Sequence, residues 1–356
     1  MTVLTQETLP TPAHRRLLSR GVWRHLLALA GLAVAALIIH GLLGSGRQFA
    51  HSLALLSHPS FGWVAVAAVC ELVSFLAYAT GQSRLARAAG HRLGVGWLAS
   101  LAVAAQALNN FLPAGYVVAN LFNFRQLRHR RLAAPVVAWL LATSSVLYIG
   151  ALAVLALVGS ELAGGRGDAS GDLRLGALAL LASFASIVLA ALTLHHRPGA
   201  RRVVLSAFDC VARRVGRRGG GAEAASRRAL ARLSEVSLSK RTAAAAGALF
   251  VLGWVADAAC LVCALLAIGA TPPWDGLLLA YCGAQLVSFL PMTPGGLGLV
   301  EGSLAITLVG TGAGAAHVLA AVLLYRAISY WATLPTGAFG YLAIRRGARP
   351  AFVAAR

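Results

Sequence analysis

Charged side chains are scarce in this sequence. Only 12% of its 356 residues are Asp, Glu, Lys or Arg, whereas a soluble domain carries about 25%. Acidic residues are rarer still, 11 against 31 basic ones, and Lys240 is the sole lysine. A chain with so little charge and 58% hydrophobic residues cannot cover a water-facing surface. The composition therefore excludes an ordinary soluble enzyme and favours a membrane protein.

Metal-binding and redox motifs are also lacking. Among five cysteines, Cys260 and Cys263 form a C-x-x-C, but it lies inside an apolar run with no histidine nearby. We interpret these thiols as small packing residues. The net charge of +20 could suggest nucleic-acid binding, yet the basic residues gather where apolar runs end, and no aromatic residues interleave with them. We therefore expect no metal, no cofactor and no nucleic-acid partner.

Apolar runs dominate what is present. A helical run needs about 20 apolar residues to cross a hydrocarbon core of about 30 Å. Six runs qualify as full crossings, at residues 26–43, 61–80, 133–158, 175–194, 243–268 and 315–342. Two further segments, 93–124 and 274–311, are broken near the middle by proline and glycine. They are too short for two crossings, which need about 40 residues and a turn, so we interpret them as re-entrant helical hairpins.

The basic residues predict the orientation of these segments. Arg47, Arg166 and Arg174 would lie outside and Arg326 within the membrane, which leaves 27 of the 31 basic residues inside. This distribution follows the positive-inside rule. It predicts a multi-pass protein of the cell membrane with both termini in the cytoplasm. The polar stretch from Thr2 to Arg20 has no apolar core of its own, so we expect no cleavable signal peptide.

The order span, span, hairpin, span occurs twice, first starting inside and then starting outside. Two short matches support a repeat: residues 105–113 resemble 284–291, and Trp63-Val64-Ala65 resembles Trp254-Val255-Ala256. The fold predicted is an all-α polytopic membrane protein with six full transmembrane helices and two re-entrant helical hairpins arranged as an inverted-topology repeat. We expect a tail at 1–22, a transmembrane domain at 23–346 and a tail at 347–356. Within the domain the repeats cover about 23–158 and 173–346.

A basic loop, residues 197–241, joins the two repeats. It carries twelve basic and three acidic residues. An interfacial helix against anionic lipid headgroups and a solvated linker both fit this pattern.

Four ionisable residues interrupt the predicted membrane segments: Glu71, Asp257, Glu301 and Arg326. A charge at the centre of a bare helix costs about 2.5–3.5 kcal/mol or more, so each needs a partner or water. Two interpretations stay open. The charges could form a structural ion pair, or they could line a polar cavity for lipid headgroups or protons.

The break in the second hairpin is the most specific motif. Pro291-x-x-Pro294-Gly295-Gly296-x-Gly298-x-x-Glu301-Gly302 ends one half-helix and starts another. We expect the new helix N-terminus near Gly296, where unpaired backbone N–H groups would suit an anionic phosphate. No strand precedes the glycines and no Gly-Lys-Ser/Thr follows, so the motif is not a nucleotide-binding loop.

This motif, with Leu324-Tyr325-Arg326 and Pro335-x-Gly337 after it, resembles the lysylphosphatidylglycerol synthase transmembrane-region family, also called the flippase-like domain family. The earlier Asn109-Asn110-x-Leu112-Pro113-x-Gly115 is similar to that family's first hairpin. There the family carries an acidic residue after the glycine and then an arginine. Here Tyr116 and Val117 follow the glycine, and Arg125 is the only candidate for the arginine.

The resemblance implies a domain that moves lipids with polar or charged heads between leaflets. The aminoacyltransferase domain of the two-domain synthases is missing from this sequence, so we expect no lysyl transfer by this chain. Its candidate substrate-binding residues are Pro291, Pro294, Gly295, Gly296, Gly298, Glu301, Arg326, Asp257, Glu71, Asn109, Asn110, Pro113, Gly115 and Arg125.

Three functions stay open at this point. The chain could be a transporter for an aminoacyl-phospholipid, a polyprenyl-phosphate-linked sugar or a similar envelope lipid. It could instead be a non-catalytic partner of a glycosyltransferase or lipid-synthesising enzyme. A membrane enzyme acting on a lipid phosphate is the third, but no nucleophile–base set or metal-ligand spacing supports it. Membrane lipids are the expected partners, and assembly into homo-oligomers is left open.

Overall fold

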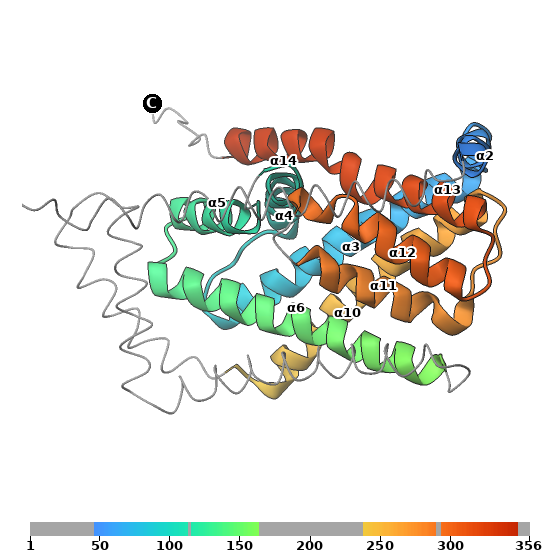
Figure 1. Ribbon diagram of the computed structural model, residues 1–356. Coiled ribbons are helices and arrows are strands. Elements are labelled where there is room, and N and C mark those ends of the chain that lie inside the picture. The colour runs from blue at the N-terminus through green and yellow to red at the C-terminus, as the bar shows by residue number, and fades with distance from the viewer. Residues whose placement is uncertain (1–45, 113–114, 164–237, 290–292, 348–356) are drawn as a thin grey trace, which may run out of the picture.

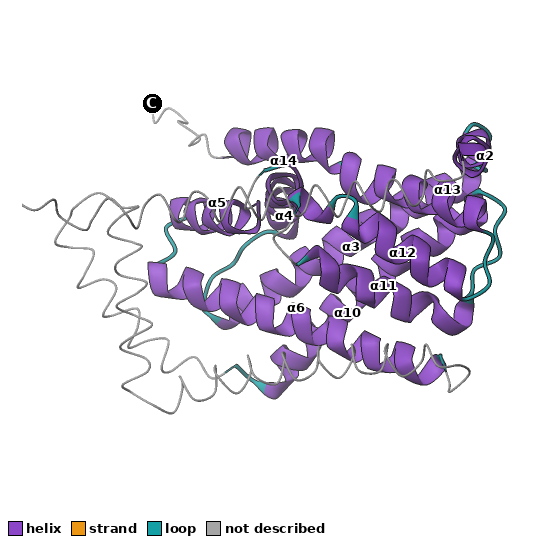
Figure 2. Ribbon diagram, in the orientation of Figure 1, coloured by secondary structure: helices purple, strands orange, loops and turns teal. Residues whose placement is uncertain are grey.

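The computed structural model describes residues 46–112, 115–163, 238–289 and 293–347. Within these residues every regular element is a helix (Figures 1 and 2). The helices are α2 (Gly46–Leu56), α3 (Phe61–Ala88), α4 (Val95–Phe111), α5 (Gly115–His129), α6 (Ala134–Leu162), α10 (Lys240–Ala267), α11 (Trp274–Ser288), α12 (Leu299–Gly310), α13 (Ala315–Arg326) and α14 (Thr333–Gly347). A 3₁₀ turn, η1 (Pro294–Gly296), precedes α12, and a π-helix, η2 (Ala327–Trp331), joins α13 to α14. The predicted all-helical class is confirmed for the described part of the chain.

Four stretches of helix are long and apolar enough to cross a membrane: α3, α6, α10 and the continuous run Ala315–Arg346. They correspond to the predicted spans at 61–80, 133–158, 243–268 and 315–342. The predicted spans at 26–43 and 175–194 lie outside the described residues, as do most of the basic loop and the two tails. The structure thus agrees with a polytopic helical membrane protein and provides four candidate spans.

Local sequence signals set the ends of the long helices. Ser239 caps α10, because its side chain accepts a hydrogen bond from the backbone N–H of Thr242 at 3.2 Å. A proline in the first turn starts α6. Gly90 follows α3 and Gly269 follows α10, with φ of +81° and +78°. Each left-handed glycine ends its helix and turns the chain back, so that the next backbone N–H, of His91 or Ala270, donates to one of the last carbonyl groups of the helix.

The centre of the molecule is the contact between α3 and α10, which pack antiparallel along most of their lengths. The backbone N–H of Ser60 donates to the carbonyl of Ala267 at one end of this contact. Toward the other end, a Cβ on Gly81 would lie 2.6 Å from the Phe250 ring. Small residues therefore bring the two helices close together, as is common between helices in membranes.

The two segments predicted as hairpins are helix pairs broken at proline and glycine. The first consists of α4 and α5, and the second of α11, η1 and α12. Their helices have 12 to 17 residues, against 28 or 29 in α3, α6 and α10. The second break lies inside the helical body rather than at its edge (Figure 1). The first pair is longer than predicted, since α5 continues to His129 instead of ending at residue 124.

The first helix of each broken segment packs against the last long helix of the other half of the chain. Helix α4 lies antiparallel to α14, where Gly337 faces Ala107 and Gly340 approaches the Ser100 carbonyl. Helix α11 packs on α6 in the same way, with Gly159 of α6 against the Leu279 backbone. In both cases the first helix of a broken segment contacts the last long helix of the other half. The sequences of the two halves nevertheless share little more than the two short matches.

Helix α2 was not predicted, because an 11-residue helix is too short to appear as a membrane run. It packs on the start of α13, where the Ser52 hydroxyl donates to the Ala316 carbonyl at 3.0 Å. The rings of His51 and His317 meet edge to face in the same contact.

Helix ends that carry basic residues gather at one end of the molecule, on the left in Figure 1. They are the last turns of α3, α5 and α14 and the first turn of α10. This is the arrangement that the positive-inside rule requires of a cytoplasmic face.

Candidate functional site

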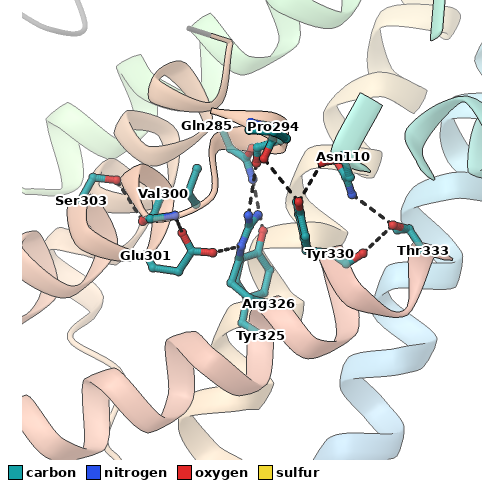
Figure 3. Close-up of polar contacts among 12 residues, drawn as sticks. Asn110, Gln285, Pro294, Val300, Glu301, Ser303, Tyr325, Arg326, Tyr330 and Thr333 are labelled. Carbon is teal, nitrogen blue, oxygen red and sulfur yellow. Dashed lines mark hydrogen bonds and ion pairs between the residues drawn. The ribbon is translucent and has the colours of Figure 1, made fainter. Parts of the chain in front are cut away.

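An ion pair joins the second broken segment to the last long helix. Arg326 Nε donates to Glu301 Oε1 at 2.6 Å, and the two side chains are only 10% and 14% exposed. Glu301 lies in the first turn of α12, and Arg326 is the last residue of α13. The sequence left open whether the buried charges pair with one another or line a polar cavity, and in the structure these two are in direct contact (Figure 3).

The break that precedes Glu301 is longer than predicted. Helix α12 begins at Leu299, so the expected N-terminus near Gly296 is wrong. The reason is a series of left-handed glycines at 295, 296 and 298, which delay the start of the α-helix by three residues. As a result the backbone N–H of Gly298 donates to Glu301 Oε2 at 2.7 Å. The protein's own carboxylate therefore occupies the position where an anion was expected.

Among the described residues, Arg326 also contacts the Gly295 carbonyl and the Tyr330 ring. Its Nη2 donates to the Gly295 carbonyl at 3.2 Å. Its guanidinium lies over the Tyr330 ring, 4.3 Å from the ring centroid. A guanidinium held by a carboxylate, a carbonyl and an aromatic face is fixed in position and largely shielded from water.

The two broken segments meet at Tyr330, which lies in the π-helix η2. The Tyr330 hydroxyl donates to the Asn110 carbonyl at 2.7 Å and lies 3.3 Å from the Pro294 carbonyl. Asn110 is buried and donates through Nδ2 to the Thr333 hydroxyl at 3.1 Å. Figure 3 shows this chain of contacts from α4 through Tyr330 to η1. Single π-helical turns frequently mark functional sites, because they place side chains that a regular helix cannot.

A second polar cluster surrounds Asp257 on α10. Its Oδ2 accepts hydrogen bonds from the Tyr281 hydroxyl at 2.6 Å and from Gln285 Nε2 at 3.1 Å. The Tyr325 hydroxyl lies 3.1 Å from Oδ1 and accepts from Gln285 Nε2 at 3.2 Å. The Glu71 carboxyl of α3 lies within hydrogen-bonding reach of Asp257. Tyr325 and Arg326 are neighbours in the chain, so the two clusters adjoin.

Comparison with known proteins decides the family. A family model described as the lysylphosphatidylglycerol synthase TM region matches residues 28–337, which is most of the chain. This chain belongs to the lysylphosphatidylglycerol synthase transmembrane-region family. A UPF0104 membrane protein of Methanothermobacter thermautotrophicus is 40% identical to it over 77 residues, which cover 22% of this chain and 22% of that protein. The resemblance that the sequence motifs indicated is confirmed.

The remaining residues that the sequence predicted for the site have smaller roles in the structure than Glu301, Arg326 and Asp257. Gly115 begins α5, and a Cβ there would lie 2.1 Å from the Asn109 carbonyl, so this pair brings α4 and α5 together through the backbone. Arg125 is exposed on α5 and forms no hydrogen bond or ion pair with any described residue. Pro113 and Pro291 lie outside the described residues.

Sequence reasoning missed the residues that connect the predicted ones. Tyr281, Tyr330 and Thr333 all hold predicted site residues in place but were not selected. A signal for two of them was available. Tyr281 precedes Gln285 by four positions and Tyr330 follows Arg326 by four, which places each pair on one helix face. In a chain with only seven tyrosines, such spacing beside a polar residue is informative.

Proposed function

We propose that this protein is a lipid transporter that moves a lipid with an anionic or polar head between membrane leaflets. The observation that carries the proposal is the Glu301–Arg326 pair at the meeting point of the two broken segments. An ion pair this well shielded is costly to build. Two hydrogen-bond donors that suit an anionic oxygen meet here, the Arg326 guanidinium and the Gly298 N–H. Both donate to the Glu301 carboxylate in this structure.

A phosphate group of a lipid would compete with Glu301 for these donors. Arginine binds phosphate through the same pair of N–H bonds that it offers a carboxylate. The first N–H groups of a helix also favour a negative charge. The Thr293 and Ser329 hydroxyls are buried and have no hydrogen-bond partner among the described residues. They lie in the chain beside η1 and within η2 respectively, so they could complete the coordination of a headgroup.

The architecture supports the same proposal. We infer six spans and two re-entrant hairpins that enter from opposite faces, arranged as an inverted repeat. The exchanged contacts α4–α14 and α6–α11 are what such a repeat predicts. Helices of 12 to 17 residues rise about 18–26 Å, which is too short to cross a hydrocarbon core of about 30 Å. Broken backbone at that depth is stable only where protein covers it or water fills a cavity, and inverted repeats place substrates at such a point.

Reconstitution tests this function. Purified protein would be placed in vesicles containing fluorescent phosphatidylglycerol, lysyl-phosphatidylglycerol or a polyprenyl phosphate. A membrane-impermeant quencher then reports how fast each lipid leaves the inner leaflet. We expect faster exchange of at least one of these lipids. The Arg326→Gln variant should lose the effect, while Arg346→Gln, which changes an exposed arginine at the end of α14, should retain it.

The opposite result would favour the partner function. In that case none of these lipids would move faster, while a glycosyltransferase or lipid-synthesising enzyme would co-purify with this protein and depend on it. The transporter proposal would then be abandoned.

A further inference from the structure

The contact between α3 and α10 contains two acidic side chains that face each other. Glu71 lies on α3 and Asp257 on α10, at the same level of the antiparallel contact, and their carboxyl groups are within hydrogen-bonding reach. Neither pairs with a basic residue in the described part of the chain. Arg326 lies close enough to attract Asp257, but its hydrogen bond is to Glu301.

One carboxylate oxygen in this contact accepts no hydrogen bond from the described residues. Asp257 already accepts from Tyr281, Gln285 and Tyr325. Glu71 Oε2 is buried and has no hydrogen-bond donor among the described residues. As carboxylates, the two groups present only acceptor oxygens to each other. Two ionised carboxylates this close and shielded from water repel strongly, and a shared proton removes one of the two charges.

We propose that Glu71 and Asp257 form a proton-binding site that couples lipid movement to proton transfer. The binding step is simple: one proton is taken up between the two carboxyl groups and is later released to water, with no other bond changed. The proton-binding claim depends only on this contact. The coupling claim also rests on the proposed transport function.

Tyr325 and Arg326 connect this site to the break. The Tyr325 hydroxyl contacts Asp257, and the next residue, Arg326, holds Glu301 and the Gly295 carbonyl. Loss of the proton would add a negative charge that draws Tyr325 and Arg326 toward Asp257, away from Glu301. The π-helix that follows immediately has the irregular backbone in which such a shift is readily absorbed.

The other titratable groups around the pair come from every neighbouring helix. They are Cys70 of α3, Tyr148 of α6, Cys260 of α10, Tyr281 of α11, and Tyr325 and Arg326 of α13. The ordinary pKa values of tyrosine, cysteine and arginine side chains lie above the physiological range. The two carboxyl groups are therefore the members of this cluster that can exchange a proton there.

Infrared spectroscopy tests proton binding without any transport. Difference spectra of the purified protein, recorded as pH is changed, should show a C=O stretching band of a protonated carboxyl group that titrates and shifts in D₂O. We expect Glu71→Gln to abolish the band. The double variant Glu71→Gln/Asp257→Asn keeps the side-chain shapes and removes both charges, so it should fold and also lack the band. Glu161→Gln, at the exposed end of α6, should retain it.

Coupling is tested in the same vesicles as transport, with a pH difference of about one unit and the membrane potential clamped. For one coupled proton, the wild-type protein should shift the leaflet ratio of a transported lipid by up to about tenfold. The double variant should show no dependence of the leaflet ratio on the pH difference.

Three results would overturn parts of this inference in distinguishable ways. A wild-type protein without a titrating band, or a double variant that keeps it, would refute the proton site. A band that responds to sodium ions instead of pH would show that the site binds a different cation. If lipid moves but ignores the pH difference, the coupling fails. If the band is present but no lipid moves at all, the transport function fails and the proton site stands.

Discussion

At the scale of single residues, the site depends on how each buried charge is balanced. Glu301 and Arg326 neutralise each other, and Gly298, Gly295 and Tyr330 satisfy their remaining hydrogen-bonding and charge requirements. Asp257 is instead held by neutral donors. The two clusters are therefore different in kind: one pairs opposite charges, and the other surrounds an acid with hydroxyl and amide groups.

The role of the ion pair can be separated from its contribution to folding. We expect Glu301→Gln to strand the buried Arg326 charge, which costs about 3–5 kcal/mol when one partner of a buried pair is removed. Replacing both residues, as Glu301→Gln/Arg326→Met, should restore the thermal unfolding midpoint in detergent. Lipid exchange in vesicles should stay absent, because the Arg326 guanidinium that would bind the headgroup is gone.

Two results would contradict this assignment. If the double variant regained both stability and lipid exchange, the pair would be purely structural. Full lipid exchange by Glu301→Gln alone would remove Glu301 from the binding site.

At the scale of elements, the break between α11 and α12 is set by backbone geometry that only glycine tolerates. Gly295 has φ of +57°, and a Cβ there would lie 2.5 Å from the Tyr330 ring and 2.9 Å from the Asn110 Cα atom. Gly295 thus lets the second broken segment touch both the first segment and the π-helix. The first broken segment, the second broken segment and the π-helix therefore pack in direct contact at Gly295.

A matched pair of glycine substitutions tests this fit. Gly295→Ala should destabilise the protein by at least about 1–3 kcal/mol, because the left-handed backbone is strained for alanine and the methyl group has no space. Gly283→Ala, in the interior of α11 with no atom within 4 Å of the new Cβ, should change stability by no more than about 1 kcal/mol and in the favourable direction. The measurement is the unfolding midpoint in detergent. Equal effects of the two substitutions would show that the contact at Gly295 is unimportant.

At the scale of the whole molecule, the basic helix ends predict which face is cytoplasmic. In a variant with the five native cysteines replaced, a cysteine at Ala222 of the basic loop should react with a membrane-impermeant maleimide only after the cells are opened. A cysteine at Thr271, between α10 and α11, should react in intact cells. Labelling of position 222 from outside would refute the proposed topology.

Properties that depend on local composition could be predicted from the amino-acid sequence. Apolar runs identified the helices of the four candidate spans, and proline with glycine located both breaks, because run length and backbone freedom are properties of neighbouring residues. The family motif also selected Glu301 and Arg326 together. The partner of each buried charge depends instead on how the helices pack: Arg326 pairs with Glu301, while Asp257 accepts hydrogen bonds from Tyr281, Gln285 and Tyr325. These contacts join residues 24 to 68 positions apart, and the meeting of Asn110 with Tyr330 spans 220. No local pattern specifies such pairs, because they depend on how the helices pack and on where the π-helix and the left-handed glycines turn each side chain.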